Sequence, residues 1–200
     1  MTSLRPRARL LASTVAAVQE VGVHAAGLTD LLHRADASRN SLYQHFPQGK
    51  AQLVETATRI VTRIVHSHLS VMADALSSAP DIEQWLDELF AFWRDPLESS
   101  EYRKGSFMLA AALDELDPAV QAAAGQAFAE WTSRLTDGFV GAGLEHTTAQ
   151  STAGLLLSVI EGAIVQARAL KSSTPFDNVR DQMTVLLKYH LTPRRHGAES

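Results

Sequence analysis

The spacing of apolar residues is the feature that most constrains the fold of this chain. Apolar side chains recur every three or four residues along most of its 200 residues, the period of a helix with one buried face. No alternating pattern typical of a β-strand is longer than four residues, and no internal repeat is visible. We therefore predict an all-α protein of roughly nine helices.

Capping and helix-breaking residues divide this pattern into elements. Gly22 is placed to end the first helix, and Ser38 is a good cap for the third. A long helix is expected from Lys50 to about Leu76. Asp81 is expected to cap the next helix and Pro96 to end it. Later boundaries are expected at Asp117-Pro118, at residues 141–143 and at Pro175.

The composition is that of an ordinary soluble globular protein, with 46% hydrophobic and 20% charged residues. The absence of cysteine excludes disulfides, thiolate metal sites and a cysteine nucleophile. The first residues lack the apolar run of a signal peptide, and the most apolar stretch, residues 153–170, is interrupted by Glu161 and Gln166. We expect a cytoplasmic protein without membrane contact, metal or cofactor.

The net charge of −4 is unevenly distributed. Residues 1–60 contain seven Lys and Arg against four acids, whereas the remainder contains eleven against eighteen. A mildly basic head on an acidic body suggests that the head meets a polyanion.

No common catalytic or nucleotide-binding motif occurs in the sequence with its required spacing. The sequence GFVGAG, residues 138–143, lacks the third glycine of a dinucleotide-binding turn and follows a helical pattern. Gly49-Lys50 has no upstream glycine at P-loop spacing, and there is no Gly-x-Ser-x-Gly elbow. We predict that the chain is not an enzyme.

Two short helices joined by a tight turn at Asp36-Ala37 indicate a helix-turn-helix. Leu42 and Phe46 would pack on the preceding helix at Leu28, Leu31 and Leu32. The outward face would carry Arg39, Asn40, Tyr43 and Gln44. Arginine suits guanine, and asparagine or glutamine can pair with adenine. An ordinary solvated three-helix head would show the same pattern, so the periodicity alone leaves both interpretations open.

The segment LTDLLHRADASRNSLYQHFPQGKAQLVETA, residues 28–57, resembles the DNA-binding head of the TetR family of bacterial repressors. Its Phe-Pro-x-Gly-Lys motif is similar to that of the LmrA/YxaF-like subgroup. The strong resemblance covers about residues 8–60. Two positions depart from the family, which usually has glycine at Asp36 and often at Asn40. Both departures concern the operator sequence rather than the class of protein.

The resemblance implies a set of DNA contacts. Thr29 and Lys50 would hold the phosphate backbone, and Arg39, Asn40 and Gln44 would read bases. Ser41, Tyr43 and His45 would mix base-edge and phosphate contacts. Residues 1–49 would form the DNA-binding domain, and residues 50–200 a helical body of about six helices for effector binding and dimerisation.

Aromatic residues at helical spacing are usually core, but the resemblance implies an effector cavity inside the body. The expected lining is Trp85, Phe92, Phe107, Met108, Trp131, Leu157 and Glu161. A buried Glu161 would need a partner, and the sequence leaves open whether it orients a ligand or joins a core pair.

The last two predicted helices carry facing apolar stripes, with small residues at Gly154, Ser158 and Gly162 that permit close helix approach. The resemblance implies that two chains form a four-helix bundle there. The expected function is a homodimeric repressor that binds a palindromic operator and is released by a small apolar or aromatic effector. The alternatives are an effector-independent DNA-binding protein and a helical protein-interaction module.

Overall fold

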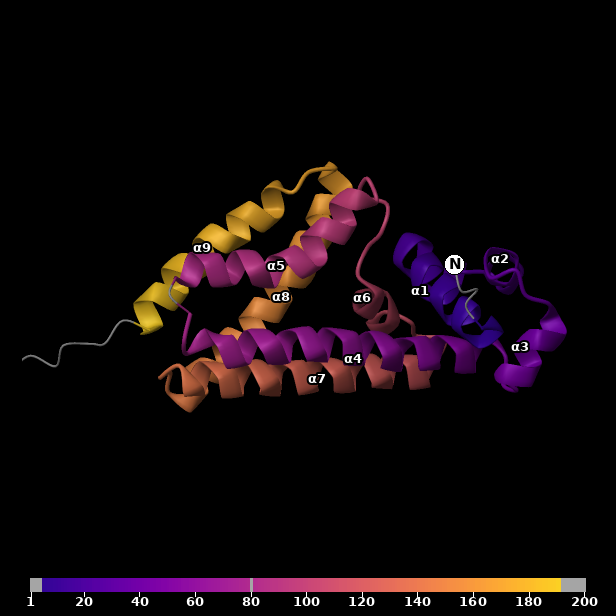
Figure 1. Cartoon of the computed structure of the whole chain (residues 1–200), viewed down its shortest axis with the longest axis horizontal. Helices are drawn as coiled ribbons and strands as arrows, with labels where there is room; N and C mark the ends of the chain where they lie inside the picture. The colour runs from indigo at the N-terminus through magenta and orange to yellow at the C-terminus, as the bar shows by residue number, and fades with distance from the viewer. Residues whose placement is uncertain (1–4, 80, 192–200) are drawn as a thin grey trace, which may run out of the picture.

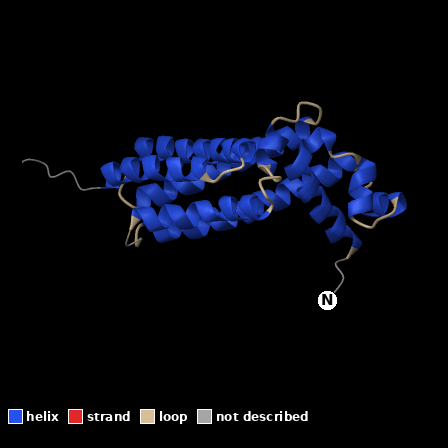
Figure 2. Ribbon diagram, turned by 90° about the horizontal axis from the view of Figure 1, so that it is seen from above, coloured by secondary structure: helices blue, strands red, loops and turns tan. Residues whose placement is uncertain are grey.

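A computed structural model describes residues 5–79 and 81–191, and every regular element within these ranges is a helix (Figures 1 and 2). The helices are α1 (Pro6–Ala25), α2 (Leu28–Arg34), α3 (Arg39–His45), α4 (Lys50–Leu76), α5 (Ile82–Ser99), α6 (Phe107–Ala112), α7 (Pro118–Gly141), α8 (His146–Leu170) and α9 (Thr174–Leu191). The predicted all-α class, with a three-helix head and a six-helix body, is confirmed.

The helices α1, α2 and α3 form a head at one end of the molecule, and α4 leads from it into the body (Figure 1). The first part of α4 packs on α1, and the rest runs parallel to α7. At Gly138 an added Cβ would lie 2.7 Å from the Cβ of Ala73, so the helices α4 and α7 approach closely there. This approach requires glycine at residue 138.

The helices α5, α8 and α9 lie over the α4–α7 pair (Figure 1). Ion pairs tie α9 to α5: Arg180 lies 2.9 Å from a carboxylate oxygen of Asp87, and Lys188 lies 2.6 Å from one of Glu83. Trp131 of α7 donates its indole N–H to the Thr62 carbonyl of α4 at 3.2 Å. These contacts fix the walls around the centre of the body.

Most predicted helix ends are confirmed by their caps. The side chains of Ser38, Asp81 and Asp117 each accept a hydrogen bond from the backbone of the helix that they precede. Gly22 does break the first helix, with a φ of 84°, but one further turn continues to Ala25.

The prediction that Pro96 ends a helix was wrong, since α5 continues to Ser99. A proline removes only one backbone donor, and the buried Leu97 anchors the continued turn in the core. The backbone N–H of Ser100 still bonds to the Pro96 carbonyl at 3.2 Å.

One helix, α8, is long and apolar enough to cross a membrane by length and composition alone. Its buried residues pack against α7 and α9, as expected for the core helix of a globular protein. The described part of the chain contains no second helix of this kind.

Candidate DNA-binding surface and effector cavity

The helix α3 has one buried apolar side and one exposed polar side. Leu42 is fully buried and Phe46, directly after the helix, is 1% exposed, whereas Tyr43 is 50% exposed. The other polar residues of the predicted recognition surface are exposed except for the half-buried Ser41: Arg39, Asn40, Gln44 and His45. The structure therefore places all six of these predicted residues on one short helix that is anchored through its apolar side. Thr29, in the first turn of α2, is also exposed.

The turn between α2 and α3 is held in place from α1. Arg9 donates from Nε to the Ala35 carbonyl at 2.8 Å and from Nη2 to the Asp36 carbonyl at 2.7 Å. Asp36 adopts the left-handed conformation, with a φ of 46°, as expected for an aspartate in place of glycine. This brace fixes α3 relative to the rest of the head.

The start of α4 packs against both the recognition helix and α1. Gly49 has a φ of 71°, and the ring of Tyr43 lies against it. The ammonium of Lys50 donates to the Val23 carbonyl at 2.9 Å, and burial lowers the pKa of Lys50. The group that was predicted to hold DNA phosphate thus also ties α4 to the end of α1.

The acids of the head are matched by neighbouring cations. Arg34 pairs with Glu20 and Asp30, each at 2.7 Å, and Arg59 pairs with Glu55 at 2.8 Å. Arg9 lies 3.9 Å from the Asp36 carboxylate. These pairs account for the four acids of residues 1–60 and for three of the seven cations, and the excess of cations in this segment comes from Arg5, Arg7, Arg39 and Lys50.

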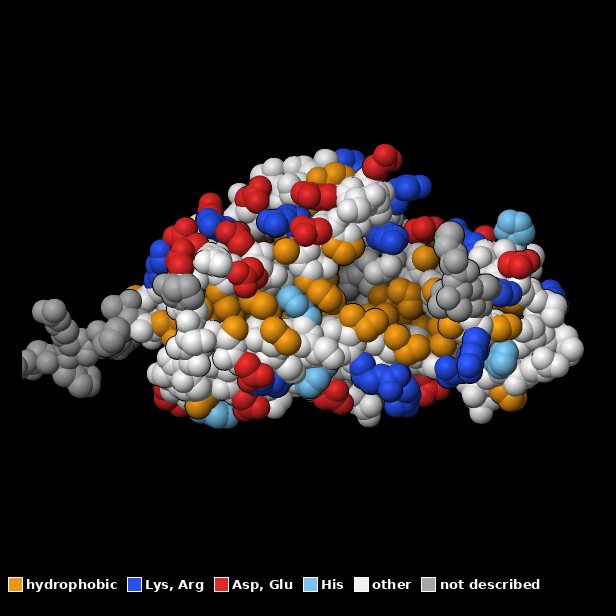
Figure 3. All heavy atoms as spheres, viewed as in Figure 1, with side chains coloured by type: hydrophobic (Ala, Val, Ile, Leu, Met, Phe, Trp, Pro, Cys, Tyr) orange, Lys and Arg blue, Asp and Glu red, His pale blue; other side chains and the backbone are white. Residues whose placement is uncertain are grey.

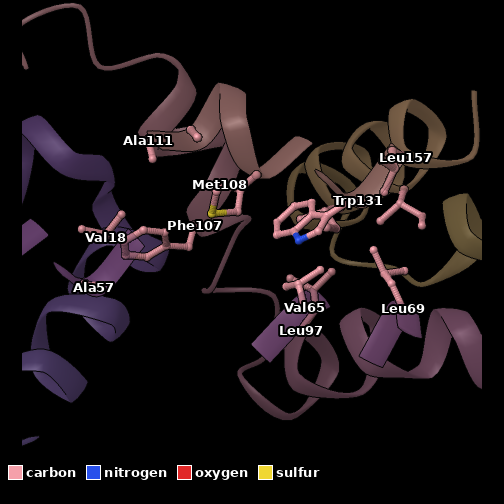
Figure 4. Packing of buried hydrophobic residues seen from close by; sticks show 14 of the residues in the cluster. Val18, Ala57, Val65, Leu69, Leu97, Phe107, Met108, Ala111, Trp131 and Leu157 are labelled. Carbon is pink, nitrogen blue, oxygen red and sulfur yellow. The ribbon is translucent and has the colours of Figure 1, made fainter. Parts of the chain in front are cut away.

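The body contains a cavity of about 600 Å³ between α1, α4, α5, α6, α7 and α8. In Figure 3 hydrophobic side chains gather along the junction of α4 and α5, beside α6. Five residues of the predicted lining do line this cavity: Phe92, Phe107, Met108, Trp131 and Glu161. Figure 4 shows that Phe107 points from α6 toward Val18 and Ala57, on the side of the head.

Glu161 is the polar centre of the cavity. Its Oε2 atom is buried and has no hydrogen-bond partner among the described residues. Burial raises the pKa of Glu161 to about 7, although a hydrogen bond from Ser106 partly offsets this effect. The carboxyl group is therefore ready to bind a hydrogen-bond donor inside an apolar cavity.

Two predicted lining residues lie elsewhere. Trp85 is 2% exposed, donates its indole N–H to the Met72 carbonyl at 2.8 Å and packs edge-on against Phe139. Leu157 is also buried in the core and does not line the cavity. Both side chains fill space between helices, because spacing along a helix does not distinguish a packed residue from a lining residue.

Sequence reasoning missed several lining residues, most clearly His68. Its ring stacks on Phe92 with centroids 4.3 Å apart, and its Nε2 lies 3.1 Å from the Leu89 carbonyl. Burial lowers the pKa of His68, so the ring is neutral at pH 7. The signal was present in the sequence, because His68 falls on the apolar stripe of α4 between Ile64 and Met72.

The cavity also reaches the head through α6 and α8. Gln19 of α1 lines the cavity, and its carbonyl accepts hydrogen bonds from the backbone of Gly105 at 2.7 Å and from Arg168 at 3.2 Å. Arg168 also donates to the Glu20 carbonyl. The last regular turns before the kink at Gly22 are thus bound to the cavity wall.

The helices α8 and α9 present an apolar outer face. Leu155 is 44% exposed and Val185 is 66% exposed. An added Cβ at Gly154 or Gly162 would meet nothing within 4 Å. Part of the apolar stripes of these two helices is buried within the same chain, at Ala163, Met183 and Leu187.

The described residues contain no group of three or more His, Cys, Asp or Glu side chains that could hold a metal ion. The two regions differ in character: α3 carries exposed hydrogen-bonding and charged side chains, and the body contains a largely apolar cavity.

Comparison with known proteins agrees with this arrangement. Residues 10–57 match the family model for bacterial regulatory proteins of the tetR family. Residues 83–182 match the family model for the C-terminal domain of LmrA/YxaF-like transcriptional regulators. The chain is 31% identical to the uncharacterized HTH-type transcriptional regulator Rv0196 of Mycobacterium tuberculosis, covering 94% of this chain and 97% of the relative. It is 25% identical to LmrA of Bacillus subtilis, covering 91% and 96% of the two chains.

Solved structures show the same fold. A TetR transcriptional regulator from Legionella pneumophila superposes with a TM-score of 0.82 at 21% identity, covering 93% of this chain and 99% of that one. A TetR regulatory protein from Rhodobacter sphaeroides superposes with a TM-score of 0.79 at 17% identity, covering 90% and 97%. With its helix-turn-helix head and LmrA/YxaF-like body, the chain belongs to the TetR family and is a transcriptional regulator, not an enzyme.

Proposed function

We propose that this protein is a cytoplasmic repressor that binds a palindromic operator as a homodimer and is released by a small apolar or aromatic effector. The observation that carries the proposal is α3, where an exposed polar face is fixed by a fully buried apolar one. A rigid short helix of this kind fits the major groove.

The proposed contacts follow the chemistry of each side chain. Arg39 would bind guanine, and Asn40 and Gln44 would pair with adenine. Ser41, Tyr43 and His45 would add base-edge or phosphate contacts. Two N–H groups of Lys50 meet the carbonyls of Val23 and His24; Thr29 and the remaining N–H of Lys50 would hold phosphate and set the position of α3.

Dimerisation would use the outer face of α8 and α9. This face combines exposed apolar residues with two glycines that leave room for another helix, as at Leu155, Val185, Gly154 and Gly162. Two chains related by a two-fold axis would place their α3 helices about 34 Å apart, or a multiple of this, to meet successive major grooves.

Release would begin at the cavity wall that touches the head. A ligand between α6 and α8 would displace the backbone of Gly105 or the side chain of Arg168, both bound to the Gln19 carbonyl. Any such shift would rotate α1 and with it α3. The ligand acts only through a difference in its affinity for the two head arrangements.

The test is selection of bound sequences from a random duplex pool, at two salt concentrations, by the wild type and by Arg39→Ala and Tyr43→Ala. We expect a palindromic consensus for the wild type and its loss in both variants. Weak, salt-sensitive binding without a consensus, unchanged in the variants, would instead support the protein-interaction module.

The second candidate is an effector-independent DNA-binding protein, whose body would have no cavity. Tight packing around both Trp85 and Trp131 would favour this candidate. Trp85 is packed tightly in the core, but Trp131 borders the cavity. The cavity therefore favours the effector-responsive function.

A further inference from the structure

The chemistry of the cavity narrows the class of effector, an inference that rests on the proposed function. The lining is mostly apolar and aromatic, with the rings of Phe92, Trp93 and Trp131 around it. Phe92 and Trp93 pack edge-on with centroids 4.9 Å apart. Such rings favour a flat apolar ligand, and their faces also attract a cation.

Four titratable side chains face this space from the elements around it: His68 from α4, Asp95 from α5, Lys104 from the loop before α6, and Glu161 from α8. The helices α1 and α7 contribute no titratable side chain to the lining, since they present neutral residues such as Gln19 and Trp131. Burial lowers the pKa of His68 and keeps its ring neutral at pH 7, although the hydrogen bond between Nε2 and the Leu89 carbonyl acts in the opposite direction. Asp95 lies at the rim, with a side chain 63% exposed and Arg94 at 3.4 Å.

Glu161 differs from the other three because its Oε2 is buried and has no partner in the described part of the chain. A buried carboxylate without a partner is costly, and a cation that binds it removes that cost. A neutral ligand of the same shape cannot form this ion pair and would therefore bind less tightly.

We propose that the cavity takes an organic monocation with a flat apolar or aromatic body, whose protonated amine donates to Oε2 of Glu161. The aromatic rings would enclose the apolar body, and Ser106 lines the same cavity as the carboxyl group. Charge selection then comes from Glu161 of α8, opposed by Lys104 in the lining, and shape selection comes from α4, α5 and α7.

The experiment compares three probes with the same ring: 2-naphthylmethylammonium, 2-naphthylmethanol and 2-naphthoate. Binding to the full chain is measured by isothermal titration calorimetry at pH 8. We expect the ammonium to bind at least about tenfold more tightly than the alcohol, and the carboxylate to bind most weakly. In Glu161→Gln the preference for the ammonium disappears, whereas Asp95→Asn, a matched control at the rim, changes it by less than about twofold.

The pH dependence gives a readout that needs no variant. A protonated Glu161 must release its proton to pair with the cation, so ammonium affinity rises between pH 6.5 and 8, where His68 is already neutral, while alcohol affinity stays constant. Proton release is measured from the binding heats in two buffers of different ionisation enthalpy. The pH dependence and the proton release therefore test the pairing of the ammonium with Glu161 even if Glu161→Gln does not fold.

Equal binding of ammonium and alcohol, or a preference that survives in Glu161→Gln, would overturn the cationic class but leave the cavity as the effector site. Failure of all three probes to bind would overturn both the cationic class and the effector role of this cavity. Neither outcome bears on DNA reading by α3, which the duplex selection tests separately.

Discussion

At the scale of single residues, the side chains of α3 and those of the cavity lining owe their positions to different causes. The outward residues of α3 follow from helical period, because one face of a seven-residue helix is buried and the other is not. Helical period does not determine which residues line the cavity. Trp85 and Trp131 both fall on apolar stripes, but only Trp131 borders the cavity. Packing between helices distant in sequence decides that difference.

Glu161 is predicted to make stability depend on pH. Its pKa is about 7 in the folded chain and near 4.5 when unfolded, so between these values the folded state binds more protons. The free energy of unfolding therefore falls as pH rises from 4.5 through 7, by up to about 3 kcal/mol. Glutamine has no such titration, so Glu161→Gln should gain stability relative to the wild type between pH 5 and 8 in urea unfolding. A constant difference across this range would contradict the burial of the carboxyl group.

Lys50 is predicted to have two separable effects. Lys50→Met removes the hydrogen bond to the Val23 carbonyl and should lower the free energy of unfolding by about 1 kcal/mol. If its remaining N–H also meets phosphate, the slope of log affinity for DNA against log salt should fall by about one. An unchanged slope would show that Lys50 only ties α4 to α1.

At the scale of elements, helix number, caps and most boundaries could be predicted, because they depend on neighbouring residues in the chain. The end of α5 could not, since the buried Leu97 and the surrounding core override the local effect of Pro96. The close approach of α4 and α7 was also invisible, because Gly138 and Gly125 look alike in sequence.

The close approach gives a matched pair of substitutions in α7. Gly138→Ala would place a Cβ 2.9 Å from the Ala73 Cα and should cost about 1–3 kcal/mol of stability. Gly125→Ala, with nothing within 4 Å, should instead stabilise the helix by about 0.5–1 kcal/mol. Thermal or urea unfolding of both variants would measure the difference, and equal effects would refute the tight contact.

At the scale of the whole molecule, the proposed two-fold dimer combines a DNA-binding head, a cavity and an apolar outer face in each chain. The head and the cavity are linked within the chain through Gln19, Gly105 and Arg168. The outer face of α8 and α9 carries exposed apolar residues, and these support the proposed dimer.

The dimer proposal predicts that Leu155→Arg converts the protein to monomers and strongly weakens binding to a palindrome, because a single head loses the second half-site. Val71→Arg is the control, since Val71 is 66% exposed and belongs to α4, which does not form that face. Sedimentation velocity would show a dimer for the control and a monomer for Leu155→Arg. A dimer in both variants would place the interface elsewhere.

The most direct measurement is the affinity of Arg39→Ala and Thr29→Ala for the selected operator and for duplexes with one base pair changed in each half-site. If Arg39 reads a base edge as proposed, Arg39→Ala loses discrimination at that position by about 1–3 kcal/mol. If Thr29 contacts only phosphate as proposed, Thr29→Ala weakens binding to every duplex by the same factor. If Arg39→Ala also weakened all duplexes equally, α3 would not read sequence, and the account of this protein as an operator-specific repressor would be wrong.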